Sequence, residues 1–189
     1  MTLTRIGGAE LDDVGQSCLR WPDLWGRPFL ALTQELLRGP SSWTTGEREL
    51  LAAVVSEANS CSFCVGTHSA IADRALPAPA FAGWRDGSAG PEVTAAAHFL
   101  VKLSKAPDQV GPEDVARTRA AGVSDGALAE AIYIAFVFNL VNRVADALGF
   151  SYRSERDRVR GSEVLRRLGY RLPGFLFAGS TSRQSKMAE

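Results

Sequence analysis

The chain has 189 residues, of which 46% are apolar and 22% charged, and its 21 basic and 21 acidic side chains cancel in formal charge. This length suits one well-buried core. The balanced charge gives no reason to expect nucleic acid or an anionic membrane as a partner. We find neither the apolar core of a signal peptide nor a run of the roughly 20 apolar residues that a membrane span needs. We therefore expect a cytoplasmic protein, in which thiols stay reduced.

The N-terminal part of the chain is predicted to be an arm followed by a helix. Residues 1–21 have no sustained hydrophobic period, and we expect at most a short turn there. Cys18 lies in this arm and is interpreted as a small, half-buried apolar residue. Pro28 can occupy the first turn of the helix that follows, and Gly39 with Pro40 ends that helix.

Two helices are predicted around a cysteine motif. Thr44 and Glu47 have the spacing of a capping box, which predicts the start of the first helix. Asn59 and Ser60 end it and offer an N-cap to the second, which places Cys61 in the first turn. Unpaired amide groups and the positive end of the helix dipole at that turn favour a thiolate over a thiol.

Beyond the motif the pattern remains helical. A loop rich in proline and glycine precedes a helix that starts at Pro91, and a short helix that starts at Pro112 closes on Gly122. The longest helix, about residues 125–148, is apolar almost all round. We therefore expect it to be the central and most buried helix of the fold.

No segment shows the alternation of a strand, so the fold class is predicted to be all-α. The strongly charged segment to about residue 168 should form an exposed helix or arm. We expect three parts, which are an N-terminal arm at residues 1–21, one helical domain at residues 22–172, and a C-terminal tail at residues 173–189.

The chemistry of the chain concentrates between Glu49 and His68. Cys61 and Cys64 stand three residues apart and His68 follows four residues later, so on a helix all three side chains share one face. Two thiols at this spacing can close a short disulfide, and a neighbouring imidazole can hold a proton. In a cytosolic protein such a pair is more often redox-active or metal-binding than a structural staple.

The residues alone leave three interpretations of this motif open. Redox chemistry is favoured over a metal site and over a structural pair of buried thiols. Zinc would need a fourth ligand beside Cys61, Cys64 and His68, supplied by Glu49, Glu57 or water. Either glutamate could act as a proton acceptor if it were partly buried, and the spacing does not choose between them.

Polar residues outside the motif are interpreted as structural. His98 should lie at the surface or in a structural hydrogen bond. Asn139, Asn142, Arg143 and Asp146 form a polar seam on the longest helix, which needs partners if it is buried. We expect the seam to join helices or subunits, with Arg143 and Asp146 paired, rather than to line the thiol site.

The motif resembles that of the AhpD-like alkylhydroperoxidases, which lie in the carboxymuconolactone decarboxylase superfamily. The residues that carry this resemblance form a Glu…Cys-x-x-Cys…His pattern: Glu49, Cys61, Phe63, Cys64 and His68. Residues 138–149 also resemble the closing helix of the peroxidase-related branch, and the resemblance covers about residues 25–150. It implies a single-domain AhpD-like helical fold that assembles into homo-oligomers. Mycobacterial relatives carry a second histidine at the position of Phe63.

The resemblance also implies roles for the motif residues. Cys64 would attack the peroxide and become a sulfenic acid, and Cys61 would then close the disulfide. His68 and Glu49 would relay protons, which selects Glu49 over Glu57. The position of Cys61 at a helix start favours Cys61 as the thiol of lower pKa, so the identity of the attacking cysteine stays open.

We therefore expect an antioxidant thiol peroxidase that reduces hydrogen peroxide or organic hydroperoxides through a redox-active disulfide. It should need no bound cofactor or metal, but an external dithiol, such as a lipoyl-type donor or a partner peroxiredoxin system, must reduce the disulfide. The alternatives are a dithiol-disulfide oxidoreductase serving a partner protein, a carboxymuconolactone decarboxylase-like enzyme, and a helical metal- or ligand-binding protein. Lactone decarboxylation does not need two thiols, which argues against that alternative.

Overall fold

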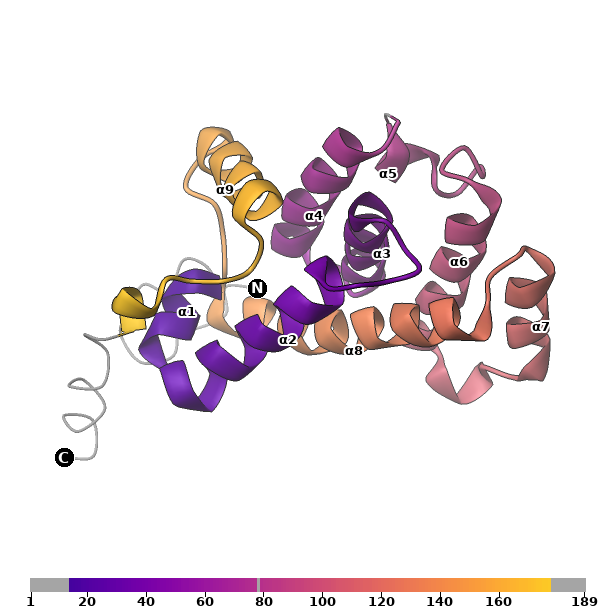
Figure 1. Cartoon of the computed structure of the whole chain (residues 1–189), viewed down its shortest axis with the longest axis horizontal. Coiled ribbons are helices and arrows are strands. Elements are labelled where there is room, and N and C mark those ends of the chain that lie inside the picture. Colours follow the sequence, from indigo (N-terminus) through magenta and orange to yellow (C-terminus); the bar gives the residue numbers. More distant parts are fainter. Residues whose placement is uncertain (1–13, 78, 178–189) are drawn as a thin grey trace.

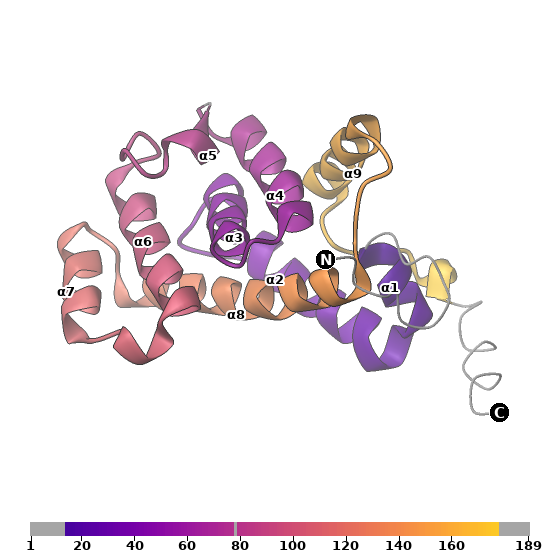
Figure 2. The same ribbon diagram turned by 180° about the vertical axis from the view of Figure 1, so that it is seen from behind.

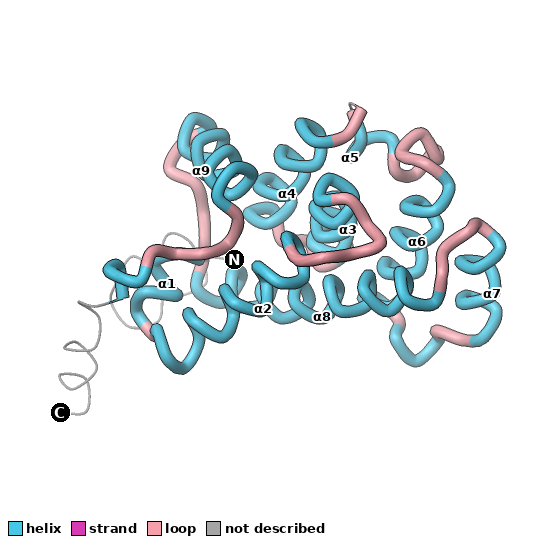
Figure 3. Tube along the Cα trace, in the orientation of Figure 1, coloured by secondary structure: helices cyan, strands magenta, loops and turns pink. Residues whose placement is uncertain are grey.

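A computed structural model describes residues 14–77 and 79–177 of the chain. Over these residues the regular structure is helical and contains no strand (Figure 3), so the predicted all-α class is confirmed. The α-helices of the described residues are α1 (Val14–Arg20), α2 (Arg27–Arg38), α3 (Thr45–Ala58), α4 (Ser62–Ala75), α5 (Ala80–Gly83), α6 (Pro91–Lys105), α7 (Pro112–Ala120), α8 (Asp125–Leu148) and α9 (Glu155–Leu168). Short π or 3-10 turns lie at Pro22–Gly26, Pro107–Gln109 and Gly174–Phe177.

Helix α3 is the centre of the fold. It packs against α4, α6 and α8, and the views from both sides show it enclosed by these helices (Figures 1 and 2). Every residue from Arg48 to Ser56 on α3 is buried. Small residues such as Ala52 and Ala53 let the neighbouring helices approach it on all sides.

The prediction that α8 is the most buried helix is wrong. One face of α8 packs on α3 and α6, but Tyr133, Phe136 and Leu140 are 59%, 60% and 43% exposed on its other side. These three residues recur at helical spacing and form the α8 outer stripe. The even apolar composition of α8 hides this difference between its faces, because hydrophobicity alone does not say which side has a neighbour.

Helix α8 is also long and apolar enough, by length and composition, to cross a membrane, which the sequence analysis did not anticipate. Half of its most apolar 18-residue window is buried inside the fold. The core helix of a soluble protein meets the same criterion, so the length and composition of α8 are weak evidence for a membrane span.

The junction between α3 and α4 positions the cysteine motif. The predicted capping box is present, because the Glu47 backbone N–H donates to Thr44 Oγ1 at 3.3 Å and the Thr44 N–H donates to Glu47 Oε2 at 2.7 Å. Ser60 then adopts a left-handed conformation, with φ of 62°. Cys61 follows in an extended conformation as the N-cap of α4, so its predicted place in the first turn is wrong by one residue. Ser60, which the prediction offered as the N-cap of α4, lies instead in the turn before that helix.

The charged C-terminal part forms helix α9, as predicted, and lies beside α4. Arg158 Nη1 donates to the Gly66 carbonyl at 2.7 Å and so ties the two helices together. After α9 the chain runs back toward α2 and α1 (Figure 1), where the Tyr170 N–H donates to Gln34 Oε1 at 2.7 Å. We call residues 169–173 the strap.

The proposed division into arm, domain and tail stays a prediction. The part of the arm that is described includes α1, in which Cys18 is fully buried rather than half-buried. Residues 1–13 and 178–189, which hold most of the arm and of the tail, lie outside the described residues.

Candidate active site

The two motif cysteines lie side by side at the start of α4. Both are free thiols, and Cys61 and Cys64 are 1% and 2% exposed. The left-handed turn at Ser60 brings Cys61, the N-cap residue, back against the first turn of α4. The Cys64 thiol is hydrogen-bonded to the Cys61 sulfur, which lowers the pKa of Cys61 although burial opposes this. The same hydrogen bond and burial together raise the pKa of Cys64. The pair therefore holds its first negative charge on Cys61.

His68 and Glu49 form a buried pair one turn further along. His68 Nδ1 lies 2.6 Å from Glu49 Oε2, and the Glu49 side chain is fully buried. A carboxylate at this distance favours the tautomer that carries the proton on Nδ1, which leaves Nε2 free to accept a proton. The structure thus brings Glu49 to His68, whereas Glu57 forms an ion pair with Arg85 at the surface.

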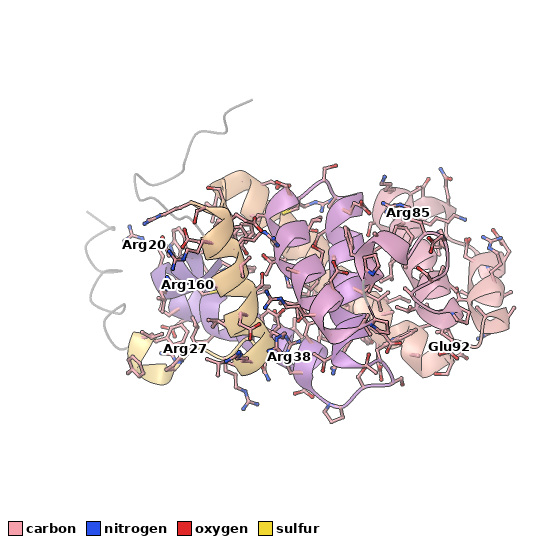
Figure 4. All side chains as sticks on the ribbon, turned by 90° about the horizontal axis from the view of Figure 1, so that it is seen from above. Arg20, Arg27, Arg38, Arg85, Glu92 and Arg160 are labelled. Atoms are coloured by element: carbon pink, nitrogen blue, oxygen red, sulfur yellow. The ribbon has the colours of Figure 1, made fainter. Side chains whose placement is uncertain are left out.

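Two residues that the sequence analysis missed also bind Glu49. Glu49 Oε1 accepts a hydrogen bond from the Tyr170 hydroxyl at 2.8 Å and lies 2.6 Å from Arg38 Nη2. Figure 4 labels Arg38 beside α9, where Nη2 also donates to the Leu165 carbonyl at 3.1 Å. Burial would raise the pKa of Glu49, but the His68 and Arg38 charges and the hydrogen bonds from His68 and Tyr170 outweigh it and lower that pKa.

A cavity of about 380 Å³ gives access to this group. Cys64, His68 and Tyr170 line it, whereas Cys61 does not. Its other walls are mainly apolar and come from α1, α2, α4, α8, α9, the segment between α8 and α9, and the strap. They include Phe29, Phe63, Phe138, Val141, Tyr152, Val164, Leu165 and Leu172. The cavity therefore presents one sulfur, one imidazole and two phenols on an otherwise mainly apolar surface.

Phe63, which separates the two cysteines in the sequence, is part of the cavity wall. Its ring stacks on Tyr152 with centroids 4.6 Å apart and meets Phe150 edge-on at 5.7 Å. The Tyr152 hydroxyl in turn forms a short hydrogen bond with Thr67 Oγ1. Phe63 thus adds apolar surface, and not an ionisable group, to the cavity wall beside Cys64.

The polar seam of α8 joins helices, as predicted. Asn59 Nδ2 donates to Asn139 Oδ1 at 3.0 Å and to Asn142 Oδ1 at 2.9 Å, and Asn142 Nδ2 donates to Ser56 Oγ at 3.1 Å. Asn142 also reaches the thiol site. The hydrogen bond from Cys64 to Cys61 and burial raise the pKa of Cys64, and a hydrogen bond with Asn142 opposes that rise. The seam is therefore mainly structural and in part a wall of the thiol site.

The expected pairing within the seam is wrong. Arg143 and Asp146, both described, form no ion pair; instead Arg143 Nη1 donates to the Asn139 carbonyl at 2.8 Å. Asp146 lies near both thiols, and its negative charge opposes their ionisation. His98 is exposed and packs edge-on against Trp84 at 5.2 Å, as expected for a surface residue. The described residues contain no group of three or more His, Cys, Asp or Glu arranged to hold a metal ion.

Known structures share this fold. No model of a protein family matches the sequence, and no curated protein matches it. The crystal structure of an uncharacterized peroxidase-related protein from Silicibacter sp. TM1040 superposes with a TM-score of 0.63 at 24% identity, covering 70% of this chain and 71% of that one. That of the alkylhydroperoxidase AhpD core, an uncharacterized peroxidase-related protein from Ralstonia eutropha JMP134, gives a TM-score of 0.67 at 28% identity, covering 74% and 76%.

The chain therefore has the AhpD-like helical fold, and its structure is similar to those of the peroxidase-related branch, as the motif predicted. The site residues Glu49, Cys61, Cys64 and His68 come together in one place. Tyr170 lies outside the stretch that carries the sequence resemblance, and nothing in its local sequence marks it. Arg38 ends an amphipathic helix, where a basic residue is ordinary, so it also gave no signal.

Proposed function

We propose that this protein is a thiol peroxidase of the AhpD-like type, which reduces hydroperoxides through a Cys61–Cys64 dithiol/disulfide cycle. The observation that carries the proposal is Cys64, hydrogen-bonded to Cys61 and set in the wall of a cavity that also exposes His68. A thiolate, and not a thiol, attacks a peroxide, so a neighbouring group that can accept the thiol proton, such as His68 or the Cys61 thiolate, promotes the attack.

In the proposed cycle Cys64 attacks first because it faces the cavity. Its proton moves to the Cys61 thiolate or to His68 Nε2, and the Cys64 thiolate attacks the outer oxygen of ROOH. The O–O bond breaks, Cys64 becomes a sulfenic acid, and the leaving alkoxide takes a proton to give ROH. The Cys61 sulfur then attacks the sulfenic sulfur, closes the disulfide and releases water. An external dithiol reduces the disulfide by exchange and completes the cycle.

The cavity supports organic hydroperoxides as better substrates than hydrogen peroxide. A volume of about 380 Å³ far exceeds the room that hydrogen peroxide needs, and the mainly apolar walls supply binding free energy only to an apolar substituent. The burial of both thiols supports a small substrate and a slender electron donor, such as a lipoyl-type arm, over a bulky protein that must reach the sulfur directly.

A homo-oligomer is part of the proposal. The α8 outer stripe leaves three large apolar side chains exposed, and a second copy of the chain would cover them. Light scattering should give a mass above that of one chain, and Phe136→Asp should lower it. A monomeric wild-type protein would contradict this part of the proposal, and detergent-dependent solubility would indicate a membrane contact instead.

The function is tested by peroxide consumption with cumene hydroperoxide and dithiothreitol. We expect Cys61→Ser and Cys64→Ser each to abolish turnover, and Cys18→Ala, which removes a third cysteine that does not line the cavity, to retain it. Full turnover in both motif variants would refute the proposal. Stoichiometric zinc in the purified protein would favour the metal-binding alternative, and a mixed disulfide with another protein, trapped in Cys61→Ser, would favour the oxidoreductase alternative.

A further inference from the structure

We infer that Tyr170 and Arg38 are positioning residues, which hold Glu49 as a fixed buried anion that orients His68 and does not itself take up the proton. This inference rests on the proposed function for its catalytic meaning, but its geometry stands independently. It differs from a relay in which the proton passes from the thiol through His68 to the carboxylate.

Both oxygens of Glu49 are already occupied by donors. Oε2 faces His68 Nδ1 at 2.6 Å, and Oε1 faces the Tyr170 hydroxyl at 2.8 Å and Arg38 Nη2 at 2.6 Å. A carboxylate that accepts charge-assisted hydrogen bonds on both oxygens has little affinity for a further proton. The lowered pKa of Glu49, in which these contacts outweigh the opposing effect of burial, agrees with this geometry.

Tyr170 can only donate to Glu49. Burial and then the Glu49 charge raise the pKa of Tyr170 well above its ordinary value, so its hydroxyl keeps its proton. The hydroxyl also lies 3.4 Å from His68 Nδ1, too far and too crowded to compete with the 2.6 Å contact to Glu49. The proton on Nδ1 is therefore fixed by the carboxylate, and Nε2 is the nitrogen left to receive the proton from a thiol.

The strap holds Tyr170 in place. The Tyr170 N–H donates to Gln34 Oε1, and the Arg38 guanidinium lies over the Tyr170 ring at 5.0 Å from the centroid. Gly169 precedes it with φ of 71°, and a Cβ there would come within 2.5 Å of Gln34 Oε1. Only glycine meets both conditions easily, so the turn into Tyr170 is built for close contact with α2.

Other ionisable groups around the pair do not replace these two contacts. Arg48 on α3 donates to the Leu36 and Gly39 carbonyls at 3.1 and 2.8 Å, away from the imidazole. The ionisable groups nearest the site come from every element packed on it: Arg38 (α2), Arg48 (α3), Cys61 and Cys64 (α4), Asp146 (α8), Tyr152 (between α8 and α9), Arg158 (α9), and Tyr170 and Arg171 (strap). Of these, Arg38 and Tyr170 are the ones in direct contact with Glu49.

The test uses NMR titration of the two histidines of the chain, His68 and His98. Tyr170→Phe removes one donor and Arg38→Gln removes the fixed positive charge, so each makes Glu49 a stronger partner for protonated His68. We expect the His68 titration midpoint to rise by up to about one pH unit in each variant. His98, exposed on another face, is the internal reference and should not move.

Two further variants separate positioning from a structural effect. Arg38→Lys keeps the charge and should restore the His68 midpoint to within a few tenths of a pH unit. Arg117→Gln, which removes an exposed guanidinium on α7, should leave that midpoint unchanged. Nitrogen chemical shifts should place the proton of neutral His68 on Nδ1. An unchanged His68 midpoint in both Tyr170→Phe and Arg38→Gln, or a proton on Nε2, would overturn the inference.

The same variants link the inference to catalysis. The acid limb of the pH profile for cumene hydroperoxide reduction should move upward with the His68 midpoint, whereas a purely structural defect would lower the rate at every pH. If the protein reduces no peroxide but the His68 midpoint moves as expected, the proposed function fails and the positioning role stands. If peroxide is reduced and the midpoint is unchanged, the reverse holds.

Discussion

The two sides of the candidate site differ in how they are built. On one side Cys64 and His68 project from a single helix, α4, and Glu49 comes from the neighbouring α3. On the other side Arg38 and Tyr170 come from α2 and the strap, segments that are far apart in the sequence. The Tyr170 N–H donates to Gln34 and joins the strap to α2, and Arg38 donates to the Leu165 carbonyl and joins α2 to α9. In the proposed cycle, the first side supplies the reacting atoms, which local helix geometry brings together. The second side supplies the tertiary contacts to Glu49 that we propose fix the protonation of His68.

The most severe way to break this arrangement is to remove the sulfur that faces the cavity. In a single-turnover reaction without reductant, we expect Cys64→Ser to consume no peroxide. Cys61→Ser should consume one equivalent and leave a sulfenic acid on Cys64 that dimedone labels, because the resolving thiol is missing. Mass spectrometry of the labelled peptide decides the assignment; dimedone on Cys61 in Cys64→Ser would mean that the thiol of lower pKa attacks despite facing away from the cavity.

Glu49→Gln should have the next largest effect. The amide no longer holds the Nδ1–H tautomer of His68, and loss of the orienting anion in a comparable acid–base arrangement costs roughly 10³- to 10⁴-fold in turnover. The variant also leaves the Arg38 charge buried without its partner, which destabilises the fold. The double variant Arg38→Gln/Glu49→Gln removes both charges; it should recover thermal stability but not activity. Recovery of activity as well would show that the anion is not needed to orient His68.

A smaller effect should follow from narrowing the cavity on the side of α9. Val164 lines the cavity and is 53% exposed, so Val164→Trp can add bulk without overpacking the core. We expect kcat/KM for cumene hydroperoxide to fall about tenfold, a loss of about 1.4 kcal/mol of transition-state binding, with little change for hydrogen peroxide. Val159→Trp, on the same helix but outside the cavity wall, is the matched control. Equal losses for both peroxides would argue against binding of the substituent in this cavity.

The smallest effect concerns stability in acid. The pKa of Glu49 is lower in the folded than in the unfolded protein, so its stabilising contribution is complete above the unfolded value of about 4.3 and declines as the pH falls through the folded value. Thermal melts between about pH 5 and pH 3 should therefore show a loss for the wild type that exceeds the loss for Arg38→Gln/Glu49→Gln by roughly a few degrees. A parallel decline in the two proteins would mean that surface carboxylates alone set the acid limit.

Much of the fold could be predicted because residues close in the sequence determine where its helices begin and end. The capping box at Thr44, the cap at Ser124 and the left-handed Gly149 bound α3 and α8 where the sequence predicts them. The start of α4 differs by one residue because Ser60, a non-glycine residue, takes the left-handed conformation. The backbone preferences of serine do not predict this conformation. It is imposed because Ser60 connects the end of α3 to a cysteine that packs against α3.

The candidate site was only half visible in the sequence, for a related reason. Cys61, Cys64 and His68 meet because residues three and four positions apart lie on the same face of a helix. Their spacing in the sequence is therefore enough to predict that they are close in space. Arg38 and Tyr170 meet Glu49 only after α2, α3 and α9 have packed, and no pattern in one sequence encodes that contact. Apolar surface on α8 could be expected from its composition, but the residues that form the exposed stripe depend on which neighbours are present and not on the helix itself.

The stacking of Phe63 on Tyr152 links the first turn of α4 to the segment between α8 and α9. Phe63 lies between Cys61 and Cys64 in the sequence. Closing a disulfide between these cysteines would tighten the first turn of α4 and so move the Phe63 ring. The stack gives oxidation an optical signature, because a change in the asymmetric surroundings of Tyr152 alters near-ultraviolet circular dichroism. The oxidised and reduced forms should thus be distinguishable by their spectra without any added label.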